Sequence, residues 1–168
     1  MQIELLSHLP EVASNRPNLL FVHGAFHGAW CWEDHYLPWF AEQGWAAHAL
    51  SLRGHAGSEG EDRLQEFTLQ DYAEDVASII ARIGGPVVLI GHSMGGVVSE
   101  LAFHASPDVA GLVFFAASPL KPATSVVLRV LRERPVTLLL AQLTGDMARM
   151  RTAMISSFFS PDISEAEL

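Results

Sequence analysis

The sequence predicts an α/β domain in which a mostly parallel sheet is flanked by helices and followed by a helical segment. Four short apolar runs, at residues 19–22, 46–52, 87–90 and 112–115, are continuous rather than alternating, as in strands covered on both faces. Helix-like segments separate them, and alternating strands and helices are typical of a parallel sheet with right-handed crossovers. A length of 168 residues suits a single core.

Composition excludes several classes of protein. The net charge is −9, with 10 basic and 19 acidic residues and no basic run, which argues against a nucleic-acid surface. Cys31 is the only cysteine, so an intramolecular disulfide is excluded. The first residues lack the features of a signal peptide, and no apolar stretch reaches the roughly 18 residues of a membrane span. We therefore expect a cytoplasmic protein without a membrane span.

The helix between the second and third apolar runs has clear end signals. Thr68 and Asp71 resemble a capping box at its start, and Gly84 follows its end. Its apolar stripe consists of Tyr72, Val76, Ile79, Ile80 and Ile83. Two further helices are predicted at about residues 38–43 and 95–106.

The character of the chain changes after Pro119. Residues 126–134, 136–143 and 147–159 all have helical patterns and no strand signal returns. We therefore divide the chain into a core at residues 1–119 and a helical lid at residues 120–168. A capping box at residues 164–167 announces a further helix just before the chain stops, so we expect the lid to be incomplete.

The third apolar run leads into the strongest motif, Gly91-His92-Ser93-Met94-Gly95. Small residues two positions before and after a serine allow a sharp strand-to-helix turn that exposes the hydroxyl, the arrangement called a nucleophile elbow. A glycine-rich turn that only packs helix against sheet would explain Gly91 and Gly95 equally well, but it would not need a serine between them. Ser93 is therefore the candidate nucleophile.

Each of the first two apolar runs is also followed by a motif. These motifs are His23-Gly24-Ala25-Phe26-His27-Gly28-Ala29-Trp30 after the first run and Leu52-Arg53-Gly54-His55-Ala56-Gly57-Ser58 after the second. With the elbow, they resemble the α/β-hydrolase family, in its branch of esterases and lysophospholipase-like enzymes. The resemblance covers residues 18–119 well and the lid only by position. It departs from the family pattern at Ala56, where the family usually has glycine.

The resemblance implies an oxyanion hole made by the backbone N–H groups of Ala25 and Met94. Such preorganised donors stabilise the charge that develops on a carbonyl oxygen under attack, by about 2.7–4 kcal/mol per donor. His23 and Gly24 would support the loop that carries Ala25, although a turn that simply needs glycine would also explain them. Met94 begins the helix after the elbow, so the positive end of the helix dipole faces the same place.

The resemblance also implies an acid and a histidine placed after the lid, and neither is found there. His104 lies eleven residues beyond Ser93 on the same helix, about 16 Å away, so it cannot be the base. His27 and His55 lie in loops at the correct end of the sheet and remain the alternatives. We expect this chain to be the N-terminal part of a hydrolase fold, inactive as it stands.

Three functions remain open. The first is a serine hydrolase that acts on small-molecule carboxylic esters through an acyl-enzyme on Ser93. The second is a hydroxynitrile lyase or a carbon–carbon bond hydrolase with the same constellation, since fold does not decide chemistry. The third is a non-catalytic module that self-associates through an open sheet edge near Phe114 and Phe115. Covalent serine chemistry implies neither a metal nor an organic cofactor.

Overall fold

The computed structural model describes residues 1–117 and Arg132. By its contacts the chain divides into two units, Met1–Leu120 and Lys121–Leu168, and nearly all described residues belong to the first. The strands are β1 (Leu5–His8), β2 (Asn18–Val22), β3 (Ala47–Leu50), β4 (Val87–His92) and β5 (Val109–Phe115). The helices are α1 (Trp30–Glu33), α2 (Tyr36–Glu42), the 3₁₀ helix η1 (Glu61–Glu66), α3 (Leu69–Ile83) and α4 (Met94–Ala105). The predicted lid, at residues 120–168, lies outside the described residues apart from Arg132.

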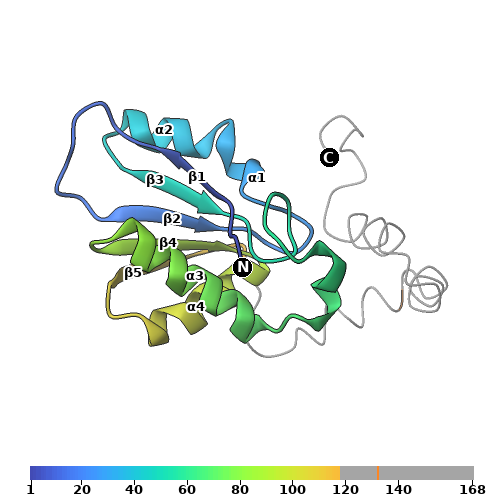
Figure 1. The fold of residues 1–168 in the computed structure, drawn as a ribbon. Coiled ribbons are helices and arrows are strands. Elements are labelled where there is room, and N and C mark those ends of the chain that lie inside the picture. Colours follow the sequence, from blue (N-terminus) through green and yellow to red (C-terminus); the bar gives the residue numbers. More distant parts are fainter. Residues whose placement is uncertain (118–131, 133–168) are drawn as a thin grey trace. The chain divides into compact units, whose positions relative to one another are not determined.

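The five strands form one sheet in the order β1-β3-β2-β4-β5 (Figure 1). β3, β2, β4 and β5 are parallel to one another, whereas β1 pairs with β3 in the antiparallel sense. The predicted α/β class with a mostly parallel sheet is thus confirmed. The parallel strands also place their carboxyl ends at one edge, which is where ligands bind in open α/β sheets.

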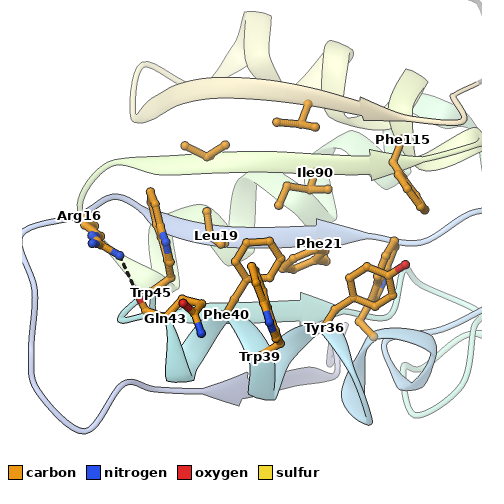
Figure 2. Close-up of a pocket in the computed structure, with 13 residues that line it drawn as sticks. Arg16, Leu19, Phe21, Tyr36, Trp39, Phe40, Gln43, Trp45, Ile90 and Phe115 are labelled. Carbon is orange, nitrogen blue, oxygen red and sulfur yellow. Dashed lines mark hydrogen bonds between the residues drawn. The ribbon is translucent and has the colours of Figure 1, made fainter.

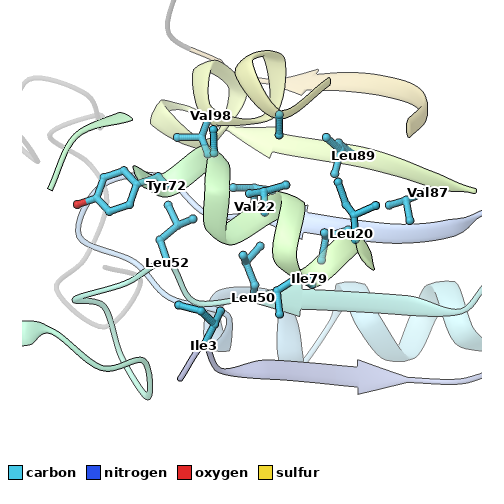
Figure 3. Close-up of a cluster of buried hydrophobic side chains, with 14 residues drawn as sticks. Ile3, Leu20, Val22, Leu50, Leu52, Tyr72, Ile79, Val87, Leu89 and Val98 are labelled. Carbon is cyan, nitrogen blue, oxygen red and sulfur yellow. The ribbon is translucent and has the colours of Figure 1, made fainter. Parts of the chain in front are cut away.

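Helices cover both faces of the sheet. In Figure 1, α1 and α2 lie over one face while α3 and α4 lie over the other. β2 shows why its apolar run is continuous: Leu20 and Val22 pack in a core cluster with α3 and α4, whereas Leu19 and Phe21 pack in a second cluster with α1 and α2. Figure 3 shows the first of these clusters.

The start of α3 forms as predicted. The Thr68 side chain accepts from the Asp71 N–H, and the Asp71 carboxylate accepts from the Thr68 N–H, which completes the capping box. The helix ends at Ile83, and Gly84 follows with φ +74°. Its predicted stripe is buried at Tyr72, Val76, Ile79 and Ile80.

The face carrying α1 and α2 has an open groove of about 740 Å³ beyond the edge of α2 (Figure 2). Its lining is strongly aromatic and comes mainly from α1, α2 and the strands β2, β4 and β5. Examples are Phe21, Trp32, Tyr36, Trp39, Phe40, Trp45, Ile90 and Phe115. β5 lies at one edge of the sheet that the described residues form, and Val113, Phe114 and Phe115 are each about half exposed.

Candidate functional site

The carboxyl ends of β2, β3 and β4 bring the three motifs of the sequence to one edge of the sheet. Val22 pairs with Leu50 on one side and with Gly91 on the other, so these strands end level with one another. The loops that follow begin at His23, Ser51 and Ser93. Segments about 70 residues apart in sequence therefore meet around one point.

Ser93 occupies a strained turn between β4 and α4. Its backbone has φ 53° and ψ −119°, values that a residue with a side chain rarely adopts. The Ser93 N–H donates to the Phe115 carbonyl at 3.2 Å, which ties the turn to β5. A non-glycine residue held in this conformation between a strand and a helix is the geometry that presents a side chain at the top of a sheet.

Two glycines make the turn sterically possible. A Cβ atom on Gly95 would collide with the carbonyl oxygens of Val22 and His23, and one on Gly91 would collide with Gly95 and Gly96. The start of α4 therefore lies directly against the end of β2. This close packing places Met94, the first residue of α4, beside the loop that follows β2, with a backbone N–H that is free of intrahelical bonding.

Gly24 brings the first loop into contact with the elbow. A Cβ built on Gly24 would lie 3.0 Å from the Ser93 Cβ and 3.0 Å from the His92 Nδ1. Ala25, the next residue, is half-buried at the same place. The structure thus gathers Ser93, Met94, Gly24 and Ala25, the set that the sequence selected.

His23 is fully buried at the end of β2. Its Nδ1 lies 2.7 Å from the Gly24 carbonyl oxygen, and its Nε2 lies 3.0 Å from the backbone nitrogen of Leu52. Burial lowers the pKa of His23 from 6.5 to about 4, with a smaller contribution from the nearby His55, His27 and His92. The ring is therefore neutral at neutral pH.

An ion pair that sequence reasoning missed holds the second loop. Arg53 binds the Asp75 carboxylate with Nε at 2.9 Å and NH2 at 2.7 Å, and the Arg53 backbone N–H donates to the same carboxylate at 2.9 Å. Asp71 accepts from Arg53 NH1 at 3.0 Å. Asp75 is only 3% exposed although it is charged. A carboxylate beside Val76 on the apolar stripe of α3 was the signal that could have indicated a buried partner.

A second missed network joins the N-terminal segment to both loops. The Ser51 hydroxyl donates to the Glu4 carboxylate and accepts from the Ala29 N–H at 2.8 Å. The same carboxylate accepts from the Gly57 N–H at 3.2 Å. No local sequence pattern announced these contacts, because Glu4 lies 47 positions from Ser51. They tie the loops that follow β2 and β3 to the segment before β1.

Ala56, which stands where the family usually has glycine, has a backbone conformation typical of glycine. Its φ is +45°, in the left-handed region that favours glycine. The loop therefore keeps the glycine-like conformation with an alanine in it.

The two alternative bases are bound to their own loops. Nδ1 of His27 lies 3.0 Å from the Ala25 carbonyl and Nδ1 of His55 lies 3.1 Å from the Arg53 carbonyl, so each ring donates from Nδ1. Within residues 1–117, no histidine is hydrogen-bonded to the Ser93 hydroxyl. The described residues thus bring the predicted nucleophile, Ser93, to the same edge as the loop of Ala25 without a histidine bound to its hydroxyl.

The described residues form neither a cluster of metal-ligating side chains nor a helix suited to cross a membrane. No group of three or more potential metal-ligating side chains comes together in that part of the chain. None of the helices described there combines the length and apolar character needed to cross a bilayer.

Comparison with known proteins identifies relatives. A sequence model of the Alpha/beta hydrolase family matches residues 19–167. A pyrethroid hydrolase of Sphingobium wenxiniae is 36% identical over 101 residues, covering 60% of this chain and 35% of its own length. Norfluorocurarine synthase 1 of Strychnos nux-vomica is 33% identical, covering 66% of this chain and 42% of its own. Methylesterase 7 of Arabidopsis thaliana is 34% identical, covering 62% and 41% respectively.

The solved structures show the same fold. A crystal structure from work on carboxylesterases of the thaumarchaeon Nitrososphaera gargenis superimposes with a TM-score of 0.71, at 22% identity, over 97% of this chain and 57% of its own. The chain spans between 35% and 42% of the length of the curated relatives described above.

Proposed function

The chain belongs to the α/β-hydrolase family, and from this premise we propose that it cleaves carboxylic esters through an acyl-enzyme on Ser93. The observation that carries the proposal is the contact between the strained Ser93 turn and the Gly24 loop. This contact supports the proposal because acyl transfer requires a nucleophilic hydroxyl and backbone N–H donors close together, and the donors we assign are those of Ala25 and Met94.

The chemistry follows from these positions. Oγ of Ser93 attacks the ester carbonyl carbon, and the Ala25 and Met94 N–H groups hold the oxyanion that forms. The alcohol then leaves with a proton, and water hydrolyses the acyl-enzyme. In this proposal the base that takes the Ser93 proton, and its acid partner, come from the length of such proteins that this chain does not span.

The relatives support an ester as substrate. One is named a pyrethroid hydrolase and another a methylesterase, and both match the part of the chain that carries Ser93. We therefore propose small-molecule esters as the substrate class.

A second candidate keeps the same site with different carbonyl chemistry. A relative named norfluorocurarine synthase 1 is a synthase by name and not a hydrolase, so the second candidate is lyase or carbon–carbon bond chemistry at Ser93. An acyl-enzyme on Ser93 separates the two candidates, because only ester hydrolysis releases the alcohol in a burst before the acyl group.

The first test is labelling with a fluorophosphonate, with and without added imidazole as a substitute base. Intact mass and peptide mapping then locate the label. We expect one adduct, on Ser93, which imidazole accelerates and Ser93→Ala abolishes. Ser99→Ala is the matched control, because Ser99 lies in α4 and is buried with an unpaired hydroxyl among the described residues. A folded protein that stays unlabelled with imidazole, or carries the label elsewhere, contradicts the proposal.

A further inference from the structure

Phe26 occupies the third position of a tight turn, where its backbone conformation favours glycine. Residues 24–27 form the turn: the His27 N–H donates to the Gly24 carbonyl at 3.4 Å, and Ala25 and Phe26 lie between them. Phe26 has φ +65°. Turns with a positive φ at the third position usually have glycine there, and for a bulky residue such a φ is a genuine outlier. The sequence thus places a phenylalanine where the backbone favours a residue without a side chain.

This choice is explained neither by the turn nor by the core. Phe26 is 39% exposed, so it is not a core residue. A single exposed apolar residue needs no explanation, but this one also bears the cost of a left-handed backbone. Strained residues persist where the surrounding structure holds them, and they gather at functional sites. Strain and exposure together indicate that the Phe26 ring serves a ligand.

His27 holds the strained turn with two hydrogen bonds. Its backbone N–H closes the turn, and its ring Nδ1 donates at 3.0 Å to the Ala25 carbonyl, which belongs to the peptide that joins Ala25 to Phe26. The His27 ring is itself stacked on the Trp30 ring, with 5.7 Å between the ring centroids. The direction in which Phe26 leaves the loop is therefore fixed by contacts of its neighbours.

The turn places Phe26 beside the candidate nucleophile. A Cβ built on Gly24 would lie 3.0 Å from the Ser93 Cβ, and Phe26 is two residues further along the chain, so its Cα lies within about 7 Å of the Gly24 Cα. Ala25, whose N–H we assign to the oxyanion, precedes Phe26 in the same turn. A group that the ester carries next to its carbonyl is therefore within reach of the Phe26 ring.

Two histidines next to the turn carry no charge at neutral pH. Burial lowers the pKa of His23 from 6.5 to about 4, and burial also lowers the pKa of His92, whose Nδ1 would lie 3.0 Å from a Cβ on Gly24. Neither ring would therefore pair with an anionic group of a substrate. The ring of phenylalanine favours another aromatic ring, in an offset or edge-to-face arrangement.

We propose that Phe26 is a specificity-determining residue whose ring packs against an aromatic ring that the substrate carries next to its ester carbonyl. The inference rests on the function proposed above and adds a substrate class, aromatic esters. Phe26 takes no part in making or breaking bonds. Its loss should therefore change which ester reacts and leave the reaction of a small alkyl ester in place.

Four variants separate the ring of Phe26 from the strain of its backbone. Phe26→Gly removes both, whereas Phe26→Tyr keeps both. Ala56→Gly relieves a φ of +45° in the loop after β3 without removing a ring, so it is the control for strain. Trp39→Ala removes a 54% exposed residue from α2, so it is the control for the loss of an exposed aromatic side chain.

The experiment measures the rate at which fluorophosphonates label Ser93 in the presence of imidazole. One pair of probes carries phenyl or ethyl on phosphorus, in the place of the acyl group of an ester. A second pair carries phenoxy or ethoxy, in the place of the alcohol. The ratio of the aromatic rate to the ethyl rate is compared between each variant and the native protein, which cancels the intrinsic reactivity of each probe.

We expect Phe26→Gly to lower this ratio about 10-fold for one of the two pairs, the size of one aromatic contact, while the ethyl rates stay within about 2-fold of native. Phe26→Tyr and the two controls should keep the native ratio. A loss in the first pair places the aromatic ring in the acyl part of the ester, and a loss in the second pair places it in the alcohol part. An unchanged ratio for both pairs, or equal slowing of all four probes, overturns the inference.

Thermal unfolding tests the argument from strain. Phe26→Gly should be at least as stable as the native protein, because it relieves the left-handed φ. A clear fall in the Tm of Phe26→Gly would show that the ring serves packing, which contradicts the inference.

A binding measurement separates failure of this inference from failure of the proposed function. If native Ser93 is labelled by none of the probes, the proposed function fails, and the aromatic contact is tested by binding alone. Ethyl benzoate or phenyl propanoate should then move the amide signals of residues 24–27 in ¹H–¹⁵N spectra of the native protein but not of Phe26→Gly, and ethyl propanoate should move them in neither. Equal shifts with all three esters, or no shift with either aromatic ester, overturn the inference.

Discussion

Asp75→Asn should destabilise the protein strongly, because it removes the negative charge that pairs with the Arg53 guanidinium. The carboxylate is 3% exposed and accepts from the Arg53 backbone, Nε and NH2. Breaking one partner of a buried ion pair costs about 3–5 kcal/mol. Arg53 is 16% exposed and keeps Asp71, which is itself partly exposed, so we expect the lower end, about 3 kcal/mol.

The assay is urea unfolding followed by circular dichroism, at low and high salt. A loss of about 3 kcal/mol corresponds to roughly 6–12 °C in Tm for a chain of this size. Glu74→Gln is the matched control: Glu74 is 63% exposed and lies 3.8 Å from Arg53, so its loss should change stability by less than about 1 kcal/mol. The double variant Arg53→Met/Asp75→Leu should be less destabilised than Asp75→Asn, because it buries no unpaired charge. A cost below about 1 kcal/mol for Asp75→Asn would refute the reasoning.

Three further predictions follow from single residues. Burial lowers the pKa of His23 from 6.5 to about 4, so the unfolded chain binds this proton more readily than the folded chain. The free energy of unfolding should therefore fall by about 3 kcal/mol as the pH drops from above 6.5 to 4. In urea unfolding at a series of pH values, His23→Asn should remove this dependence on pH. Burial raises the pKa of the Cys31 thiol to about 11, so its alkylation at pH 8 should be about two orders of magnitude slower than that of a free thiol, and alkylation at the free-thiol rate would show an open site. Ala56→Gly should raise the free energy of unfolding by up to about 1 kcal/mol, because it relieves a left-handed φ; clear destabilisation by the same urea assay would show that the alanine packs usefully.

The sequence predicted the elements whose pattern is long or punctuated. The strands with continuous apolar runs, the capped helix α3 and the turn at Ser93 are in place. β1 was missed because Leu5–His8 is a four-residue, half-buried strand with no pattern to distinguish it, and it is fixed only by its pairing with β3. α1 and η1 were missed for the same reason, since neither is longer than six residues.

The site shows the same division. Motif spacing predicted which segments lie together at this edge of the sheet, because it records local backbone geometry; the roles of their residues stay predictions. The contacts that support the site were not predicted, because each joins segments far apart in sequence: Glu4 binds Ser51, Arg53 binds Asp75, and His23 binds Leu52. Such partners are brought together by the packing of strands and helices, which no local pattern encodes.

The aromatic groove gives the protein an internal optical reporter. The chain has four tryptophans, and three of them line the groove: Trp32, Trp39 and Trp45. Trp39 is 54% exposed. Indole emission shifts to shorter wavelength when water is replaced by apolar contacts. The emission maximum of unlabelled protein therefore reports the solvent exposure of this surface. The binding of any molecule or chain that displaces water from it can be followed by titration without an added probe.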